Sequence, residues 1–302
     1  MKNLFPVYFL FSLLSNFCYS QQISKSWKDV NYADDTLVAH QLDIYLPTTK
    51  LNKYPAIIVI YGSAFFGNNM KHIAFETLGG PLLEGCFAVI AVNHRSSRDA
   101  IFPAQINDVK AAVRFVRAKA DEYQIDPSFI GITGYSSGGH LSAFTGTSNG
   151  VGPFSVGVEH MDIEGKVGKF TSTSSKVDAV VDWFGPTDFQ VMDSCGSTMV
   201  HDAVDSPESV FIGGPIQEND DKCTLANPIT YVDPNDPPFL IFHGDKDPLV
   251  PHCQSEMLYE VLQENSVESQ LVIIPEAGHG PGVFEEKYFR MMMDFLIEEL
   301  GK

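Results

Sequence analysis

Short, nearly continuous apolar segments recur along this chain and alternate with segments whose apolar residues lie at helical spacing. Apolar side chains on successive residues suit strands that are covered on both faces, as in a parallel sheet. The predicted strands of this kind are AIIVIYG (56–62), FAVIAVN (87–93), FIGITG (129–134), VDAVVDWFG (177–185), PPFLIFHG (237–244) and SQLVIIP (269–275). A further segment, QLDIYLP (41–47), alternates apolar and polar residues and predicts a half-exposed strand.

Helices are predicted between or after these strands. Apolar residues recur every three or four positions over 106–116, 257–262 and 289–296. Strand and helix in alternation indicate an α/β fold, with a mostly parallel central sheet and helices on both faces. Because ligands of such sheets bind beyond the carboxyl ends of the strands, the residues after each apolar run are the candidates for chemistry.

The first twenty residues differ from the rest of the chain. Lys2 precedes an apolar stretch over 4–14, and small and polar residues follow up to Ser20. This order is typical of a secretory signal peptide, and the stretch is too short to span a membrane. We expect a signal peptide over 1–20, with a retained anchor as the alternative, and one catalytic domain over 21–302 in a secreted or periplasmic protein.

The chain is strongly acidic, with 38 acidic against 20 basic residues and a net charge of −18. Such a surface repels phosphate polymers and anionic lipid. We therefore expect no nucleic-acid partner and no membrane insertion after signal cleavage, and a neutral substrate fits better.

Four cysteines follow the predicted cleavage site, and export would permit disulfides between them. Cys86 begins an apolar run, so we expect it to be a buried thiol. Cys195 and Cys223 both lie in polar surroundings rich in Gly, Pro and Asp, and we predict a disulfide between them. These cysteines, with Cys253, lack metal-ligand spacing, and no metal site is predicted.

The stretch GITGYSSGGH (131–140) follows a predicted strand and contains the nucleophile-elbow pattern G-x-S-x-G. Gly134 and Gly138 are needed because side chains there would collide across the tight turn. Ser136 occupies the position of the nucleophile, and the backbone N–H of Ser137 can face a developing oxyanion. The alternative is a glycine-rich helix entry without chemistry.

A serine nucleophile needs a base and an orienting acid, in the chain order Ser, Asp or Glu, then His. Asp245 and Asp247 both follow the strand PPFLIFHG, and His279 follows SQLVIIP in a glycine-flanked loop. We predict His279 as the base; His252 is a weaker candidate because it begins a predicted helix and suits a cap. The residues themselves leave the choice between the two aspartates open.

The loop after the first buried strand is expected to supply oxyanion-hole amides. We assign these donors to Ser63 and Ala64, together with Ser137; a simple turn that contributes only one of them is the alternative. Phe65, Phe66 and Trp183 are candidate substrate-binding residues, although core packing competes with this role.

From Gln41 to the C-terminus the chain resembles the α/β-hydrolase superfamily, in its esterase branch. The stretch FPAQINDVKAAVRFVRAKADEYQIDPSFIGITGYSSGGHLSA carries this resemblance, and HGDKDPLVP resembles the H-G-x-x-D-x-x-V-P segment of these esterases, which places the acid at Asp247. Family esterases often carry H-G-G-G-W in the oxyanion loop, where this chain reads YGSAF. The departure replaces a histidine with Tyr61 and adds bulk near the site.

Within that branch, IYGSAFFGNN and HGDKDPLVPHCQSE are similar to secreted bacterial feruloyl and acetyl-xylan esterases. The resemblance implies hydrolysis of a carboxylic ester of polysaccharide or oligosaccharide through an acyl-enzyme intermediate, without metal or organic cofactor. It leaves open whether the acyl group is acetyl or feruloyl. A serine peptidase of the same fold and an inactive carbohydrate-binding homologue are the rival interpretations.

Residues 150–176 are rich in Gly, Ser and Thr and predict a long surface excursion. A lid, a substrate wall or a disordered insertion without a role would each account for it.

Overall fold

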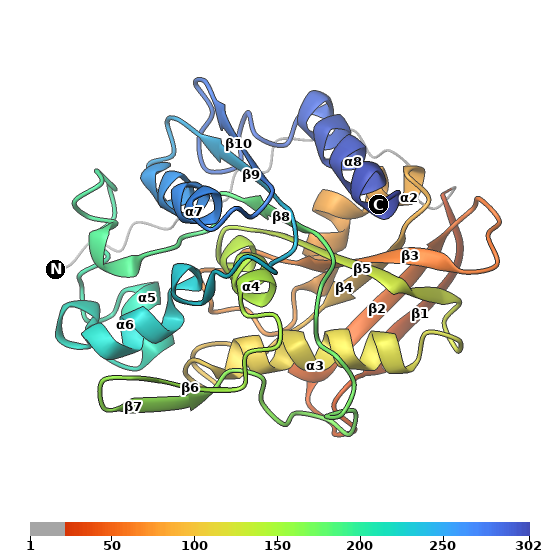
Figure 1. Ribbon diagram of the computed structural model, residues 1–302, viewed down its shortest axis with the longest axis horizontal. Coiled ribbons are helices and arrows are strands. Elements are labelled where there is room, and N and C mark those ends of the chain that lie inside the picture. Colours follow the sequence, from red (N-terminus) through yellow and green to blue (C-terminus); the bar gives the residue numbers. More distant parts are fainter. Residues whose placement is uncertain (1–21) are drawn as a thin grey trace, which may run out of the picture.

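The strands of the computed structural model, which describes residues 22–302, form one eight-stranded sheet beside a separate two-stranded hairpin (Figure 1). The signal peptide predicted over 1–20 lies outside the described residues. In sheet order, the strands are β1 (Ile23–Asn31), β2 (Gln41–Pro47), β4 (Ala88–Val92), β3 (Tyr54–Ile60), β5 (Ile125–Tyr135), β8 (Val180–Trp183), β9 (Phe239–Gly244) and β10 (Ser269–Ile274). Pairing is antiparallel for β1–β2 and β2–β4 and parallel from β4 to β10, which confirms the mostly parallel sheet.

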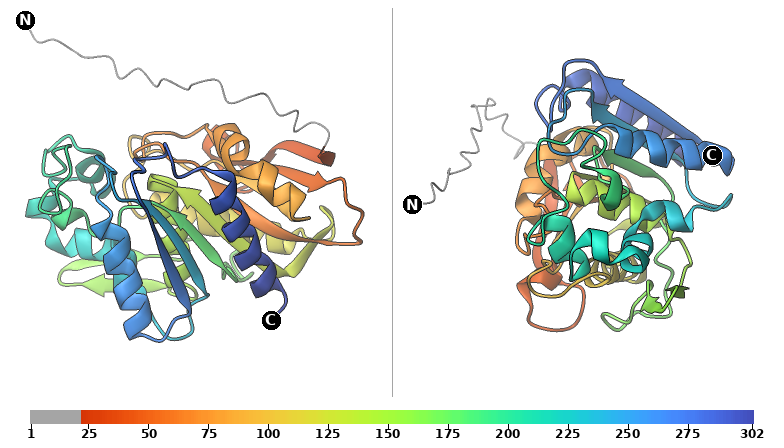
Figure 2. Two further views of the ribbon diagram at one scale, coloured as in Figure 1. Left: turned by 90° about the horizontal axis from the view of Figure 1, so that it is seen from above. Right: turned by 90° about the vertical axis from the view of Figure 1, so that its left-hand side faces the viewer.

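Helices cover both faces of this sheet (Figures 1 and 2). The helices are α1 (Lys71–Ala74), α2 (Gly80–Glu84), α3 (Ala104–Ala118), α4 (Ser137–Thr147), α5 (Pro207–Ile212), α6 (Asp220–Ala226), α7 (Cys253–Glu264) and α8 (Glu286–Leu300). Side chains of α3, α4 and α7 share one buried cluster, and those of α2 and α8 share another. The predicted helices correspond to α3, α7 and α8.

Strand β3 shows why the sheet strands have continuous apolar sequences. Ile58 and Ile60 belong to the cluster with α3 and α4, whereas Ile57 and Val59 belong to the cluster with α2 and α8. Alternate side chains of a strand point to opposite faces, so a strand with helices on both faces must be apolar at every position.

The prediction of a half-exposed strand over 41–47 is wrong in its burial, because all residues of β2 after Gln41 are buried. The polar residue of this strand, Asp43, is paired: its carboxylate lies 3.1 Å from the Nζ atoms of both Lys28 and Lys71. Lys28 comes from β1, a strand that the apolar pattern did not predict. A polar side chain in the strand therefore marks a buried ion pair and not a solvent-exposed face.

The excursion over 150–176 is partly ordered as the hairpin β6 (Pro153–Val156) and β7 (Glu159–Asp162). Its hydrogen bonds run to neighbouring helices: Asn107 of α3 donates to the carbonyls of Asp162 and Ile163, and the Val158 N–H donates to Asp221 of α6. These contacts fix the segment to the flank formed by α3 and α6.

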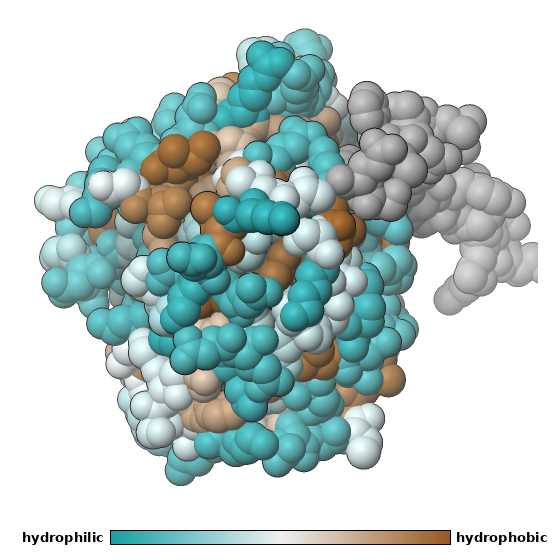
Figure 3. Space-filling model, turned by 90° about the vertical axis from the view of Figure 1, so that its right-hand side faces the viewer, coloured by the Kyte–Doolittle hydropathy of each residue, from teal (hydrophilic) through white to brown (hydrophobic). Residues whose placement is uncertain are grey.

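Residues 184–238 form the long connection between β8 and β9 and contain α5 and α6. This connection lies at the left of the molecule in Figure 1 and faces the viewer in the right-hand view of Figure 2. The opposite side, drawn in Figure 3, is mainly hydrophilic, with hydrophobic areas that are small and separate. Within residues 22–302, no helix has the length and apolarity needed to cross a membrane.

Candidate active site

Ser136 lies on the sharp turn between β5 and α4, with φ 56° and ψ −127°. This conformation is strained for a residue with a side chain. The turn is possible because Gly134 and Gly138 lack Cβ atoms. A Cβ on Gly134 would lie 2.3 Å from the Gly138 carbonyl oxygen, and one on Gly138 would lie 2.4 Å from the Ile60 carbonyl oxygen. The elbow predicted from the glycine spacing is therefore present.

His279, in the loop after β10, connects the serine to an aspartate. Its Nε2 lies 2.9 Å from Ser136 Oγ, and its Nδ1 lies 2.7 Å from Asp247 Oδ2. Both distances permit the hydrogen bonds of a serine–histidine–acid relay. The three residues thus meet at the carboxyl ends of β5, β9 and β10.

The carboxylate of Asp247 is held from two directions. Its Oδ2 faces His279, while its Oδ1 accepts the backbone N–H groups of Leu249 and Val250 at 2.9 and 3.0 Å. Burial by itself would raise the pKa of Asp247, but hydrogen bonds with His243 and His279 outweigh burial and hold this pKa well below its ordinary value. An ionised Asp247 can stabilise a positive charge on His279.

Asp245, the competing acid, has a different partner. Its Oδ1 accepts the Glu276 N–H at 2.7 Å and so joins the loops after β9 and β10. The geometry agrees with the resemblance, which placed the acid at Asp247. His252 lies at the N-cap position of α7, with its Nε2 3.6 Å from Glu256 and without a side-chain capping bond.

The oxyanion loop after β3 differs in one respect from the prediction. The Ser63 N–H donates to Ser137 Oγ at 2.8 Å, so this amide already has a partner. Ala64 is exposed, with φ 50°, and Ser137 is the first residue of α4, where a backbone N–H has no acceptor within the helix. Ala64 and Ser137 are therefore the better candidate donors, and the Ser137 hydroxyl links the two loops.

Two of the three aromatic residues predicted to contact substrate are core residues instead. The Phe65 ring stacks on Phe211 with centroids 4.0 Å apart, and the Trp183 ring stacks on Phe242 with centroids 4.2 Å apart. Phe65 and Trp183 are 1% and 0% exposed, respectively. Phe66 is half-buried, and the Arg98 guanidinium lies 4.3 Å from its ring centroid. Only Phe66 keeps the predicted role as a candidate.

The predicted disulfide between Cys195 and Cys223 is wrong. Cys195 is bonded to Cys253, the first residue of α7, and Cys223 is a buried free thiol. Polar surroundings in the sequence misled the assignment of Cys223, because it lies on the inward face of α6. Cys86 is free, as expected, but only half-buried.

Two further residues shape the site and were not among the predicted site residues. The buried ring of Phe184 packs edge-on against His279 with centroids 4.7 Å apart. His243 places its Nε2 3.5 Å from Asp247 Oδ2 and 2.8 Å from the Val250 carbonyl oxygen. His243 is the histidine of the H-G-x-x-D segment, so this motif contained the missed signal.

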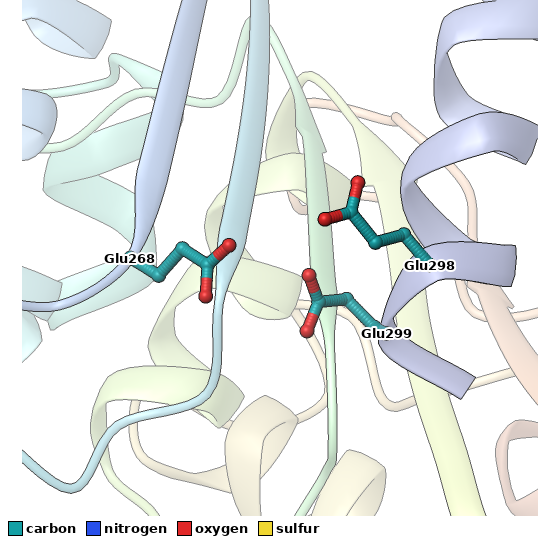
Figure 4. A group of neighbouring side chains, drawn as sticks. All are labelled: Glu268, Glu298 and Glu299. Carbon is teal, nitrogen blue, oxygen red and sulfur yellow. The ribbon is translucent and has the colours of Figure 1, made fainter. Parts of the chain in front are cut away.

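Away from this site, three carboxylates lie close enough to share a cation: Glu268, Glu298 and Glu299 (Figure 4). The Lys302 ammonium lies 2.8 Å from oxygens of both Glu268 and Glu299. A side chain of the protein itself therefore already pairs with two of the three carboxylates, and we assign no ligand to this cluster.

Comparisons with known proteins agree with the geometry. A family model described as BD-FAE matches residues 42–262. A solved structure described as "Truncated form of carbohydrate esterase from gut microbiota" is 52% identical, with a TM-score of 0.90 over 93% of this chain and 98% of that one. A second, "Bifunctional GH43-CE Bacteroides eggerthii", is 50% identical, with a TM-score of 0.87 over 91% of this chain and 35% of that one.

A curated relative, "Probable carboxylic ester hydrolase LipM" of Mycobacterium tuberculosis, is 30% identical over 250 residues, which are 82% of this chain and 54% of the relative. The chain spans about half the length of the first curated relatives it matches, with 54%, 55% and 59% of each covered.

Proposed function

Because the chain belongs to the BD-FAE family of α/β-hydrolase esterases, we propose that it is a serine carboxylic-ester hydrolase acting on acylated plant cell-wall polysaccharide. The observation that carries this proposal is the continuous relay from Ser136 Oγ through His279 to the buried carboxylate of Asp247.

The mechanism follows from the roles that these groups can take. His279 Nε2 accepts the Ser136 proton while Oγ attacks the ester carbonyl, and the amides of Ala64 and Ser137 stabilise the oxyanion. The protonated His279 then gives its proton to the leaving alcohol, which leaves an acyl group on Ser136. Water repeats the sequence, with His279 again as base, and releases the carboxylic acid.

The substrate class is proposed from similarity and charge. The 52%-identical structure is described as a carbohydrate esterase, and the 50%-identical one as a bifunctional enzyme whose description names a CE part. A net charge of −18 favours an uncharged substrate over an anionic one. We propose acetyl or feruloyl groups as the acyl part, with Phe66 as the aromatic residue beside it.

Secretion is part of the same proposal. The predicted signal peptide and the Cys195–Cys253 disulfide both suit an oxidising compartment. Mass spectrometry of the exported protein should find Gln21 at the N-terminus.

The function is tested by comparing an aryl acetate, a feruloylated sugar and a dipeptide anilide with the same preparation. We expect both esters to be cleaved and the anilide to be stable. The S136A variant serves as the control for contaminating hydrolases. Preferential cleavage of the anilide would identify a peptidase, and the absence of any cleavage would identify an inactive homologue.

A further inference from the structure

The segment over residues 195–201, far from Asp247 in the sequence, holds the turn that contains Asp247. The Thr198 N–H and its Oγ1 hydroxyl both donate to the Pro248 carbonyl oxygen, at 2.8 and 2.7 Å. Ser197 Oγ and His201 Nε2 both lie 2.9 Å from the Leu249 carbonyl oxygen. The Cys195–Cys253 disulfide attaches the same segment to the start of α7.

These contacts reach the carboxylate of Asp247 through two peptide groups. The Pro248 carbonyl and the Leu249 N–H belong to one peptide group, and the Leu249 carbonyl and the Val250 N–H belong to the next. Both N–H groups donate to Asp247 Oδ1, while both carbonyls accept from the segment. Hydrogen bonds in such a chain polarise one another and fix the orientation of the peptide plane.

His201 can donate to Leu249 only if its Nε2 carries a proton. Its Nδ1 lies 2.9 Å from Glu208 Oε2, and both its side chain and that of Glu208 are buried. An ionised carboxylate and a carbonyl only accept hydrogen bonds, so with Glu208 ionised the histidine between them carries a proton on each ring nitrogen. The contacts therefore describe a buried imidazolium ion paired with Glu208.

We propose that His201 and Glu208 form a positioning pair that orients Asp247, and through it His279, for the proposed ester hydrolysis. His201 contacts neither Ser136 nor His279 in the described hydrogen bonds and acts through the Leu249–Val250 peptide group. The predicted effect on catalysis rests on the proposed function, whereas the charge of His201 and its contact with Leu249 do not.

The pair makes this positioning depend on pH. Burial disfavours the imidazolium, but Glu208, the Leu249 carbonyl and the charge of Asp193 outweigh burial and raise the pKa of His201. The charged groups that face it are Glu208 from α5 and Asp193, whose carboxylate accepts the His201 N–H at 2.8 Å. The contact is complete below the raised pKa and is lost as the pH rises through it.

Loss of the His201 charge also removes a second donor. Ser197 Oγ lies 3.0 Å from His201 Nε2 as well as 2.9 Å from the Leu249 carbonyl oxygen. When Nε2 loses its proton it becomes an acceptor, and the Ser197 hydroxyl can turn toward it. The Leu249 carbonyl would then lose both side-chain donors together.

The catalytic test compares H201Q and E208Q with the matched control H40Q. His40 is also a buried histidine between two acceptors, Asp35 at 2.6 Å and Asp108 at 3.2 Å, but it directly precedes β2 and neither partner belongs to the turn that contains Asp247. With 4-nitrophenyl acetate, we expect H201Q to lower kcat about 10-fold at nearly unchanged KM, and H40Q to leave kcat within about 2-fold.

E208Q tests the pH dependence without removing the histidine. Loss of the carboxylate should lower the pKa of His201, so the alkaline limb of the kcat profile should move to lower pH. An unchanged limb in E208Q, or equal losses of kcat in H201Q and H40Q, would overturn the proposal.

Nitrogen-15 NMR of the histidine side chains separates this inference from the proposed function. We expect His201 to be mainly doubly protonated at about pH 6.5, the ordinary pKa of histidine, and the His279 Nδ1 proton to exchange faster in H201Q than in wild type. A His201 that is mainly neutral at this pH would reject the positioning pair even in an active esterase. The expected spectra in a protein that cleaves no ester would reject only the function.

Discussion

Ser136 and Ser137 are adjacent hydroxyls with different partners. Ser136 Oγ faces His279, whereas Ser137 Oγ accepts the Ser63 N–H. We expect S136A to lower ester turnover by about 10³- to 10⁶-fold. S137A removes one hydrogen bond between two loops and keeps the backbone amide, so its expected loss is about 3- to 10-fold. Steady-state kinetics on an aryl acetate checks this, and comparable losses at both positions would contradict the assignment of the nucleophile.

The two aspartates after β9 should also differ sharply. D247N should lower kcat about 10⁴-fold, close to the effect of H279A, because an amide cannot hold His279 in the required tautomer. D245N removes only an acceptor of the Glu276 N–H, and we expect a loss below about 10-fold. Measured kcat values for the three variants decide the matter; a larger loss in D245N would mean that the acid is misassigned.

At the scale of elements, the Cys195–Cys253 disulfide joins the segment after β8 to α7 across 58 residues of chain. Replacing both cysteines by serine should lower the free energy of unfolding by about 2–5 kcal/mol, as measured by guanidinium denaturation. C86S is the control, because this half-buried thiol is free. A non-reducing peptide map should link Cys195 to Cys253, and a link to Cys223 would refute the pairing.

Strand β8 contains a buried aspartate, Asp182, whose titration makes the free energy of unfolding depend on pH. Burial raises the pKa of Asp182 to about 7, although its carboxylate accepts the Gly185 N–H at 3.0 Å. The folded protein therefore holds a proton that the unfolded chain loses near pH 4. This group makes the free energy of unfolding fall as the pH rises from about 4 to 7, by at most about 4 kcal/mol, and adds no slope above that range.

D182N removes this titration, so its unfolding free energy should depend less on pH between 4 and 7 than that of the wild type. Urea denaturation at a series of pH values measures the difference. Identical slopes in both proteins would show that Asp182 ionises normally in the fold.

At the scale of the whole molecule, net charge predicts substrate preference. The chain carries a net charge of −18. Adsorption to an anionic lipid surface requires an excess of basic residues, which this acidic chain lacks. We expect kcat/KM for methyl ferulate and acetylated xylan to exceed that for an acyl ester of about twelve carbons or more. Preference for the long chain would overturn the carbohydrate-esterase proposal.

Local patterns in the sequence determined the parallel sheet and the nucleophile elbow. Strands such as β3 must be apolar at each position because both faces are covered, and the pattern is visible without the rest of the fold. Gly134 and Gly138 were informative for a similar reason, since the tight turn excludes Cβ atoms at fixed offsets from Ser136. The chain order of serine, acid and histidine predicted His279 as the base, and the resemblance of HGDKDPLVP to family esterases selected Asp247 as the acid.

Tertiary structure alone decided which distant groups meet. Cys195 pairs with Cys253 because the segment after β8 lies against the start of α7, a contact that no local spacing records. The buried Asp43 pairs with Lys28 from a strand that was not predicted. The Ser63 N–H donates to the hydroxyl of Ser137, which is distant in the sequence and begins α4. The contact of His201 with the Asp247 turn has the same origin. Periodicity reports which face of an element is covered, whereas pairing between elements depends on how the packed sheet and helices bring their loops together.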